Sequence, residues 1–364
     1  MVINFGAGPA KLPEEVLLEV QRDLIQHGQS GISVMEMSHR SKEYSDIHLK
    51  ALQAVRDILN VPDNYKVLFM QGGGTGIFSA ICMNLMGKTG IADYCVTGTW
   101  STLAYKEATK YGKVNMVFPK PAKFTTVPDQ STWTLDPNAS YVYYCDNETV
   151  NGVEFPFIPD TNGVPLVADM SSNMLSRPFD ITKFGLVFGG AQKNIGPAGI
   201  TVVVVRDDLI GNAMPTTPTI LDFKVTVANN SLYNTPPTFA IYVMGLVFEW
   251  IKKKGGLEAM NANALTKSQL IYKAIESSNG FYTCPVDLKY RSRMNVPFRA
   301  GSTTGDEALE AEFLKGAEKL AMVQLKGHRS VGGIRASLYN AVSVENAQVL
   351  AKYMNDFYNS HKTN

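Results

Sequence analysis

The sequence has few cysteines, and none of them is spaced for a disulfide framework or a zinc site. Cys82, Cys95, Cys145 and Cys284 lie far apart in the 364 residues, and no two of them form a C-x-x-C pair. Isolated cysteines of this kind are typical of reduced thiols in a protein core. We therefore expect neither disulfides nor a metal site.

The chain also lacks an excess of charge of either sign and any apolar run long enough to span a membrane. Thirty-four basic residues face thirty-three acidic ones, a formal charge of +1, so no global field attracts nucleic acid or an anionic membrane. Glu14, Glu15 and Glu19 stand where a signal peptide needs an apolar run. We expect a cytoplasmic protein that binds neither nucleic acid nor membranes.

The chain does have the length and apolar content for two domains. Hydrophobic residues make up 45% and charged residues 18%, a composition that favours a large buried core over disorder. Short apolar runs alternate in part with helical patterns, which is typical of crossover units on a mostly parallel sheet. The runs cover 67–70, 94–96, 116–118, 141–145, 164–168 and 186–188, and helical patterns cover 77–85 and 102–110.

One further run breaks the parallel pattern. Residues 200–205 follow the run at 186–188 too closely for a helical crossover, so this strand should be antiparallel. The fold class is therefore α/β, with a seven-stranded, mostly parallel sheet in the large domain.

Helix signals place the domain boundaries. The first helix starts at Pro13 and should run to about Gly28, and a pattern over 242–254 ends in three lysines and two glycines. We assign 16–260 to the large domain, and 1–15 together with 261–364 to a smaller α/β domain. The smaller domain should hold helices near 307–321 and 344–357, with a strand at 334–338.

Lys193 is the leading candidate for chemistry. It lies in the segment G-G-A-Q-K-N-I-G-P-A-G from Gly189, between two predicted buried strands. A cramped site lowers the proton affinity of an amine, and glycines let a flat cofactor approach the backbone, which favours a Schiff-base lysine. The alternative is a surface turn with a solvated lysine.

Asp169 directly follows the run at 164–168, at the carboxyl end of a predicted strand, where open α/β sheets place ligands. Its carboxylate is suited to pair with a protonated pyridine nitrogen. Taken alone, Asp169 is equally suited to cap the turn at Ser171 and Ser172.

A glycine-rich loop precedes the helical pattern at 77–85. Its sequence, G-G-G-T-G from Gly72, would present free backbone N–H groups to a phosphate at the start of a helix. A dinucleotide fingerprint is the alternative, but the loop matches it poorly because Ser79 occupies the last glycine position.

The remaining candidates gain weight only in combination. Trp100 is suited to stack on a cofactor ring or to fill the core, and Thr149 to bind a cofactor or cap a loop. Arg335 alternates with apolar residues in a predicted strand, so we expect it to have a carboxylate partner. Four more basic residues would suit a phosphate if they converge: His39, Arg40, His328 and Arg329.

Seven motifs along the chain are close to those of one family. They are N-F-G-A-G-P-A from Asn4, E-M-S-H-R-S from Glu36, Q-G-G-G-T-G from Gln71, D-M-S-S-N from Asp169, G-A-Q-K-N-I-G-P-A-G from Gly190, Y-N-T-P-P from Tyr233 and G-H-R-S-V-G-G-I-R-A-S from Gly327. On these motifs the chain resembles, from end to end, the phosphoserine aminotransferases, class V aminotransferases with the fold type I architecture.

The resemblance implies pyridoxal 5'-phosphate (PLP) as the cofactor, bound in the large domain. Lys193 would form the Schiff base, Asp169 would pair with the pyridine nitrogen and Trp100 would stack on the ring. Further cofactor contacts would come from Gly74, Thr75, Thr149 and Gln192, and from Asn234 and Thr235 of a neighbouring subunit. The resemblance therefore implies a homodimer.

The resemblance also implies the substrates. Arg335 would bind the α-carboxylate, and His39, Arg40, His328 and Arg329 would bind a phosphate or side-chain carboxylate, some of them across the subunit interface. The amino group of glutamate would pass reversibly to 3-phosphohydroxypyruvate, giving phosphoserine and 2-oxoglutarate in serine biosynthesis, by a ping-pong mechanism. Lys193 would act as general base and acid.

Three alternatives are weaker. A dehydrogenase would leave Lys193 and Asp169 unexplained. Another class V enzyme, such as an alanine:glyoxylate aminotransferase or a cysteine desulfurase, would not need the phosphate-binding residues. A catalytically inactive binding protein on the same scaffold would not need Lys193.

Overall fold

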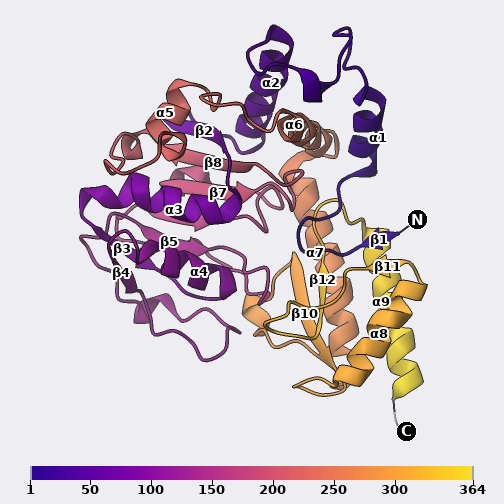
Figure 1. Cartoon of the computed structure of the whole chain (residues 1–364). Coiled ribbons are helices and arrows are strands. Elements are labelled where there is room, and N and C mark those ends of the chain that lie inside the picture. The colour runs from indigo at the N-terminus through magenta and orange to yellow at the C-terminus, as the bar shows by residue number, and fades with distance from the viewer. Residues whose placement is uncertain (1, 363–364) are drawn as a thin grey trace.

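The computed structural model describes residues 2–362 and contains two regions (Figure 1). The larger region is built on a seven-stranded sheet, and the smaller one holds both ends of the described chain. Residues 1, 363 and 364, which the sequence assigns to the smaller domain, lie outside the described residues.

The large sheet has the strand order β2-β8-β7-β6-β5-β3-β4. Its strands are β2 (Tyr65–Met70), β3 (Ile91–Tyr94), β4 (Lys113–Met116), β5 (Val142–Cys145), β6 (Leu166–Asp169), β7 (Leu186–Gly190) and β8 (Thr201–Arg206). Strand β8 runs antiparallel to both of its neighbours, and the other pairs are parallel. The predicted mostly parallel sheet with one antiparallel strand is therefore confirmed.

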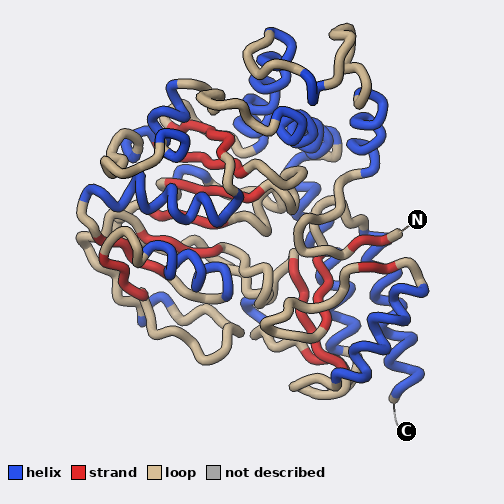
Figure 2. The backbone as a smooth tube through the Cα atoms, in the orientation of Figure 1, coloured by secondary structure: helices blue, strands red, loops and turns tan. Residues whose placement is uncertain are grey.

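Helices cover both faces of this sheet (Figure 2). In β8, Val203 and Val205 pack in a core with α3 (Gly73–Leu85) and α4 (Thr99–Ala108). Val202 and Val204 point to the opposite core, which contains residues of α1 (Glu14–Asp23), α2 (Lys42–Ile58) and α6 (Thr238–Lys253). Burial on both faces explains why the strands read as continuous apolar runs.

Several predicted boundaries were wrong. The runs at 94–96 and 116–118 overlap β3 and β4 by one residue each, because the chain stays buried after these strands end. Helices α3 and α4 begin at Gly73 and Thr99, before the predicted 77 and 102. The first turns of both helices hold small, polar or cavity-facing residues, so the apolar periodicity that predicts a helix starts only after them. The first helix ends at Asp23 and does not reach Gly28.

The smaller region contains two further sheets. A three-stranded sheet has the order β12 (Ile334–Ser337), β10 (Asn295–Ala300), β9 (Tyr282–Thr283), and β1 (Ile3–Asn4) pairs with β11 (Met322–Val323). Helices α8 (Glu307–Lys319) and α9 (Val344–His361) pack beside them (Figure 1). Short α5 (Phe223–Ala228) lies on the large region instead.

Helix α7 (Gly256–Glu276) connects the two regions. It follows α6 after a tight turn in which Gly255 has a φ of 98°, a left-handed conformation that favours glycine. Leu257 and Met260 of α7 join the core of the large region, whereas Ile271 and Ile275 join the core of the smaller region. The change from one core to the other thus falls within this helix, between Met260 and Ile271. Over residues 2–362, no helix is both long and apolar enough to cross a membrane.

Candidate active site

A cavity of about 170 Å³ lies where β5, β6 and β7 end and α3 begins. Its walls bring together these residues that the sequence singled out: Gly74, Thr75, Trp100, Thr149, Asp169, Gln192 and Lys193. They come from five separate segments, which meet because the carboxyl ends of parallel strands share one edge of the sheet.

Lys193 lies in the turn between β7 and β8, and its side chain is buried, with 8% exposed. Its Nζ donates a hydrogen bond of 2.6 Å to Oγ1 of Thr149 and lies 5.8 Å from the centre of the Trp100 ring. Burial lowers the pKa of Lys193, and the nearby Asp169 carboxylate opposes that shift. The site therefore favours a neutral, nucleophilic amine more than water does, and the solvated surface lysine is excluded.

Asp169 is the last residue of β6, and 4% of its surface is exposed. Its carboxylate accepts hydrogen bonds from the Ser171 N–H at 2.8 Å and the Tyr143 hydroxyl at 3.4 Å. Burial raises the pKa of Asp169, whereas the bonds from Ser171 and the charge of Lys193 lower it. Asp169 thus caps its own turn and also faces the cavity, so the two interpretations of this residue are compatible.

The start of α3 offers an anion site. The first hydrogen bond of the helix runs from the N–H of Gly76 to the carbonyl of Gly72, so Gly73, Gly74 and Thr75 have N–H groups without an acceptor inside the helix. All three line the cavity. Gly72 has a φ of 97°, which favours glycine at the residue that turns the chain into the helix. Free N–H groups at a helix start favour a phosphate.

The lining fits PLP in its chemistry. A reactive amine, a buried carboxylate and a phosphate-binding helix start face one space. The indole of Trp100 borders the same space, and its buried Nε1 has no hydrogen-bond partner among the described residues. An aldehyde, a pyridine nitrogen, a phosphate and an aromatic ring are the groups that this set would bind.

Arg335 on β12 reaches the site from the smaller region. Its Nη1 donates to the carbonyl of Thr149 at 3.3 Å, and burial lowers its pKa. No carboxylate among the described residues lies within ion-pair distance of Arg335. The expected carboxylate partner is therefore not a residue of the described chain. Burial lowers the pKa of His328, and the charges of Arg335 and Arg329 lower it further.

Seven of the predicted residues do not line the cavity: His39, Arg40, Asn234, Thr235, His328, Arg329 and Arg335. His39 and Arg40 lie in the loop before α2, and Thr235 is exposed before α6. Asn234 lines a different cavity, where its Oδ1 accepts from Nε2 of Gln71 at 3.3 Å.

Other lining residues were not predicted as site residues: Phe78, Cys145, Asn147, Ser171 and Ser172. Ser171 follows Asp169 in the D-M-S-S-N motif, and its Oγ accepts from the N–H of Gly190, so it joins two strand ends. The feature of the sequence that could have identified Ser171 is its position two residues after Asp169. Glu148, which precedes Thr149, was missed as well.

Comparison with known proteins identifies the family. The family model described as Aminotransferase class-V matches residues 2–350. A phosphoserine aminotransferase of Drosophila melanogaster is 66% identical over 363 residues, covering 100% of both chains. A probable phosphoserine aminotransferase of Caenorhabditis elegans is 56% identical over 363 residues, covering 100% of this chain and 98% of that one.

Solved structures agree with this relationship. A phosphoserine aminotransferase from Bacillus circulans subsp. alkalophilus superposes with a TM-score of 0.96 at 45% identity, covering 100% of this chain and 99% of that chain. A PLP-bound phosphoserine aminotransferase from Trichomonas vaginalis superposes with a TM-score of 0.94 at 42% identity, covering 97% and 99%.

Fold and site together define a PLP-dependent aminotransferase of class V with the fold type I architecture. A dehydrogenase is excluded. Within that class, the chain belongs to the phosphoserine aminotransferase family.

Proposed function

We propose that this chain transfers the amino group of L-glutamate reversibly to 3-phosphohydroxypyruvate, forming O-phospho-L-serine and 2-oxoglutarate in L-serine biosynthesis. One observation carries the proposal: the buried amine of Lys193 faces the buried carboxylate of Asp169 beside a phosphate-binding helix start. The site matches the activity that the names of the relatives give for those proteins. We expect the enzyme to act in the cytoplasm.

The protein's residues divide the work. Bound PLP supplies an electron sink for the bonds at the substrate's α-carbon. Lys193 would hold the cofactor through its neutral amine and would serve as base and acid for the proton at the substrate's α-carbon. Thr149 orients that amine by their 2.6 Å hydrogen bond. Asp169 would offer its carboxylate to the pyridine nitrogen, and Trp100 would stack on the ring.

Phosphate recognition falls to the start of α3. The N–H groups of Gly74 and Thr75 would hold the cofactor phosphate together with the side chain of Gln192, since all three residues line the cavity. On the substrate side, the planar guanidinium of Arg335 would hold the α-carboxylate at two points. His328 and Arg329, joined by His39 and Arg40, would bind the substrate phosphate or the side-chain carboxylate of glutamate.

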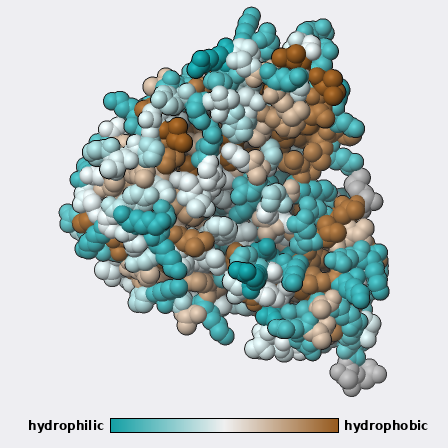
Figure 3. Space-filling view, viewed as in Figure 1, coloured by the Kyte–Doolittle hydropathy of each residue, from teal (hydrophilic) through white to brown (hydrophobic). Residues whose placement is uncertain are grey.

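A homodimer would complete the site. Apolar side chains gather on the surface around α1 and the loop that follows it (Figure 3). The exposed ones are Leu17, Leu18, Leu24, Ile25, Ile32 and Met35. A patch of this kind favours a protein partner. A second copy would cover it and supply Asn234 and Thr235 to the cofactor, so dilution to monomers should release PLP, as sedimentation and absorbance can measure.

The substrate proposal is tested by an assay of the purified protein with glutamate and 3-phosphohydroxypyruvate. Phosphoserine should exceed serine in kcat/KM by about two to four orders of magnitude, because serine forgoes charge-assisted hydrogen bonds of roughly 1.5–3 kcal/mol each. Serine or alanine within tenfold of phosphoserine would contradict the phosphate pocket and favour another class V activity.

A further inference from the structure

Glu148 is a fully buried carboxylate between the two segments that face Lys193. Its exposed fraction is 0%, and it is paired with no cation among the described residues. It accepts hydrogen bonds from the N–H of Trp100 at 2.9 Å, the N–H of Ser101 at 2.9 Å and the hydroxyl of Ser101 at 2.5 Å. A buried carboxylate without a cation is costly, so its place here calls for a reason.

The start of α4 explains how the charge is tolerated. Trp100 and Ser101 belong to the first turn of α4, where N–H groups have no acceptor inside the helix. The residue before the helix is Gly98, which has no side chain to cap those groups. Glu148 caps them from another loop, 47 or 48 residues along the chain. Its carboxylate therefore fixes the backbone that carries the Trp100 ring.

The backbone of Glu148 is equally constrained on the side of Thr149. Its N–H donates to the carbonyl of Val153 at 2.8 Å, and its carbonyl accepts from the N–H of Gly152 at 2.7 Å. This turn presents the next residue, Thr149, whose hydroxyl holds Lys193. One residue thus ties together the two groups that contact or face the lysine from different loops.

Gly98 makes room for this arrangement. A Cβ at position 98 would overlap the Glu148 carboxyl group. The backbone of Gly98 is extended, so the requirement is one of space alone. Gly98→Ala is therefore a second way to displace the same carboxylate.

We infer that Glu148 is a positioning residue that holds Trp100 and Thr149 in register against Lys193. The inference rests on the proposed function, because Lys193 must be the cofactor lysine for it to matter. The titratable and charged groups that act on Lys193 are Asp169, Cys145, Arg335 and Glu148, and Glu148 raises its pKa.

Glu148→Gln tests the inference with PLP bound and no substrate present. The amide keeps the size of the side chain but removes the charge and cannot accept from all three donors. We expect the PLP dissociation constant to rise roughly tenfold. The pH midpoint of the visible absorbance band should fall by roughly half a unit or more, because a nearby negative charge favours the protonated nitrogen.

Two variants separate position from charge. Glu148→Asp keeps the charge but shortens the side chain, so PLP affinity should fall while the pH midpoint stays near that of the wild type. Glu154→Gln is the matched control, since Glu154 is also buried in the same turn but pairs with Arg293. It should lower the melting temperature and leave the midpoint unchanged.

The inference is overturned if Glu148→Gln lowers the melting temperature but leaves PLP affinity and the pH midpoint unchanged, since Glu148 would then serve only the fold. If Glu148→Gln does not fold, Gly98→Ala decides, and unchanged PLP affinity in that variant overturns the inference. A wild-type protein that binds no PLP would instead contradict the proposed function.

Discussion

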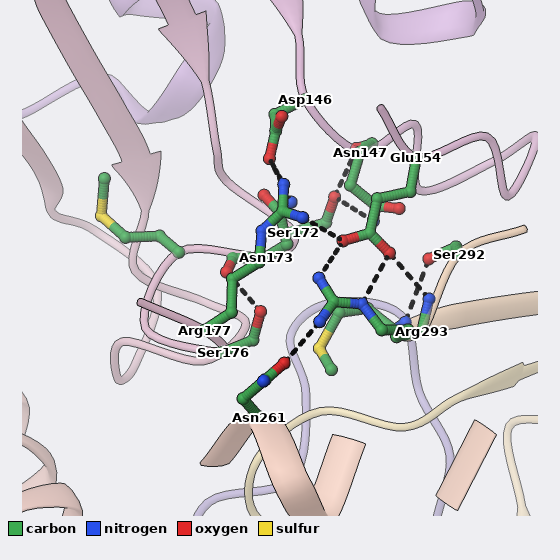
Figure 4. Close-up of polar contacts among 12 residues, drawn as sticks. Asp146, Asn147, Glu154, Ser172, Asn173, Ser176, Arg177, Asn261, Ser292 and Arg293 are labelled. Atoms are coloured by element: carbon green, nitrogen blue, oxygen red, sulfur yellow. Dashed lines mark hydrogen bonds and ion pairs between the residues drawn. The ribbon is translucent and has the colours of Figure 1, made fainter. Parts of the chain in front are cut away.

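Two sets of buried or half-buried charges lie beyond the strand ends of the large sheet, and they differ in how their charges are paired. The first is the site, with Lys193 and Asp169. The second is a ladder of alternating charges, formed by Asp146, Arg177, Glu154 and Arg293 (Figure 4). Both sets begin at the same strand ends, because Asp146 follows β5 directly and Arg177 follows Asp169 by one short turn.

Every charge in the ladder meets an opposite one. Arg177 lies 2.7 Å from Asp146 and 3.7 Å from Glu154, and Arg293 lies 2.6 Å from Glu154. Arg293 also donates to Asn261 of α7 at 2.5 Å, so the ladder joins the large region to the smaller one. The site differs, because neither Lys193 nor Asp169 has an ion-pair partner within 4.0 Å among the described residues.

The pKa shifts follow this difference. Burial raises the pKa of Glu154, but Arg293 and Arg177 outweigh burial and lower it below the ordinary value. In the site burial prevails, raising the pKa of Asp169 and lowering that of Lys193. Buried charges that have ion-pair partners therefore hold the fold together, whereas buried charges that lack them remain available to a ligand.

The largest effect is expected from Lys193→Ala, which removes the buried amine that has no ion-pair partner and that we propose as the cofactor lysine. Turnover of glutamate with 3-phosphohydroxypyruvate should fall by roughly four orders of magnitude or more, with the melting temperature of the PLP-free protein little changed. Lys183→Ala, at an exposed lysine, is the control and should keep full activity. Steady-state kinetics with calorimetry would measure both, and an active Lys193→Ala protein would remove Lys193 from the mechanism.

Glu154→Ala tests the paired set of charges. It leaves Arg177 and Arg293 without their shared partner, so the free energy of unfolding should fall by about 3–5 kcal/mol. Glu249→Ala, which removes an exposed pair with Lys252, should change it by less than about 1 kcal/mol. Equal effects of the two substitutions in denaturant titrations would show that the ladder is not structural.

Asp169→Asn should slow the half-reaction with glutamate by roughly a hundredfold, because the neutral amide no longer stabilises a protonated pyridine nitrogen. The PLP-free protein should be at least as stable as the wild type, since an underpaired buried charge is lost. Single-turnover absorbance measures the rate of the half-reaction, and calorimetry measures the stability. Wild-type rates would reduce Asp169 to a turn cap.

The smallest effect is a difference in the sign of pH dependence in the PLP-free protein. The pKa of Asp169 is raised above 3.8 on folding, so its ionisation lowers stability as the pH rises above that value. The pKa of Glu154 is lowered below 4.5, so its contribution is fully present above pH 4.5 and is lost as the pH falls through its folded pKa.

The substitutions Asp169→Asn and Glu154→Gln should therefore change the slope of unfolding free energy against pH in opposite directions, each by up to about 1.4 kcal/mol per pH unit. Denaturant titrations between about pH 3.5 and 7 would measure it. Slopes that change in the same direction would contradict the assigned pairing.

The sequence predicted the sheet and the residues that converge on one cavity because both depend on local patterns. Apolar runs mark strands buried on both faces, and Asp169 and the glycine loop from Gly72 each follow such a run directly. Once the strands pair in parallel, their carboxyl ends meet at one edge of the sheet, and no further sequence signal is needed to predict that. Lys193 was distinguished by its small neighbours and by the motif around it.

The sequence did not predict contacts that join distant segments. Arg293 meets Glu154 across 139 positions, and Glu148 caps α4 across 47, so neither pairing has a spacing that local reasoning detects. The strand ends at 94 and 116 were missed because buried chain continues past the last ladder pair. The roles proposed for Asn234 and Thr235 would require a second chain, which local patterns do not place.

A second buried lysine makes the central claim testable. Lys267 is 1% exposed, and burial lowers its pKa to about 7. Its Nζ donates to three carbonyls, those of Leu338, Tyr339 and Val342, at 2.8–2.9 Å. All three donors of its ammonium group are thus bound, whereas Lys193 has one side-chain hydrogen bond and faces a cavity.

Borohydride reduction of the protein with bound PLP, followed by digestion and mass spectrometry, distinguishes the two lysines. Our account holds that the buried lysine with few partners is the one that binds PLP. It predicts that the pyridoxyl group will be found on the peptide that contains Lys193, in near-stoichiometric yield, and that Lys267 will be unlabelled. Labelling of Lys267 or of an exposed lysine, with Lys193 unmodified, would contradict the account.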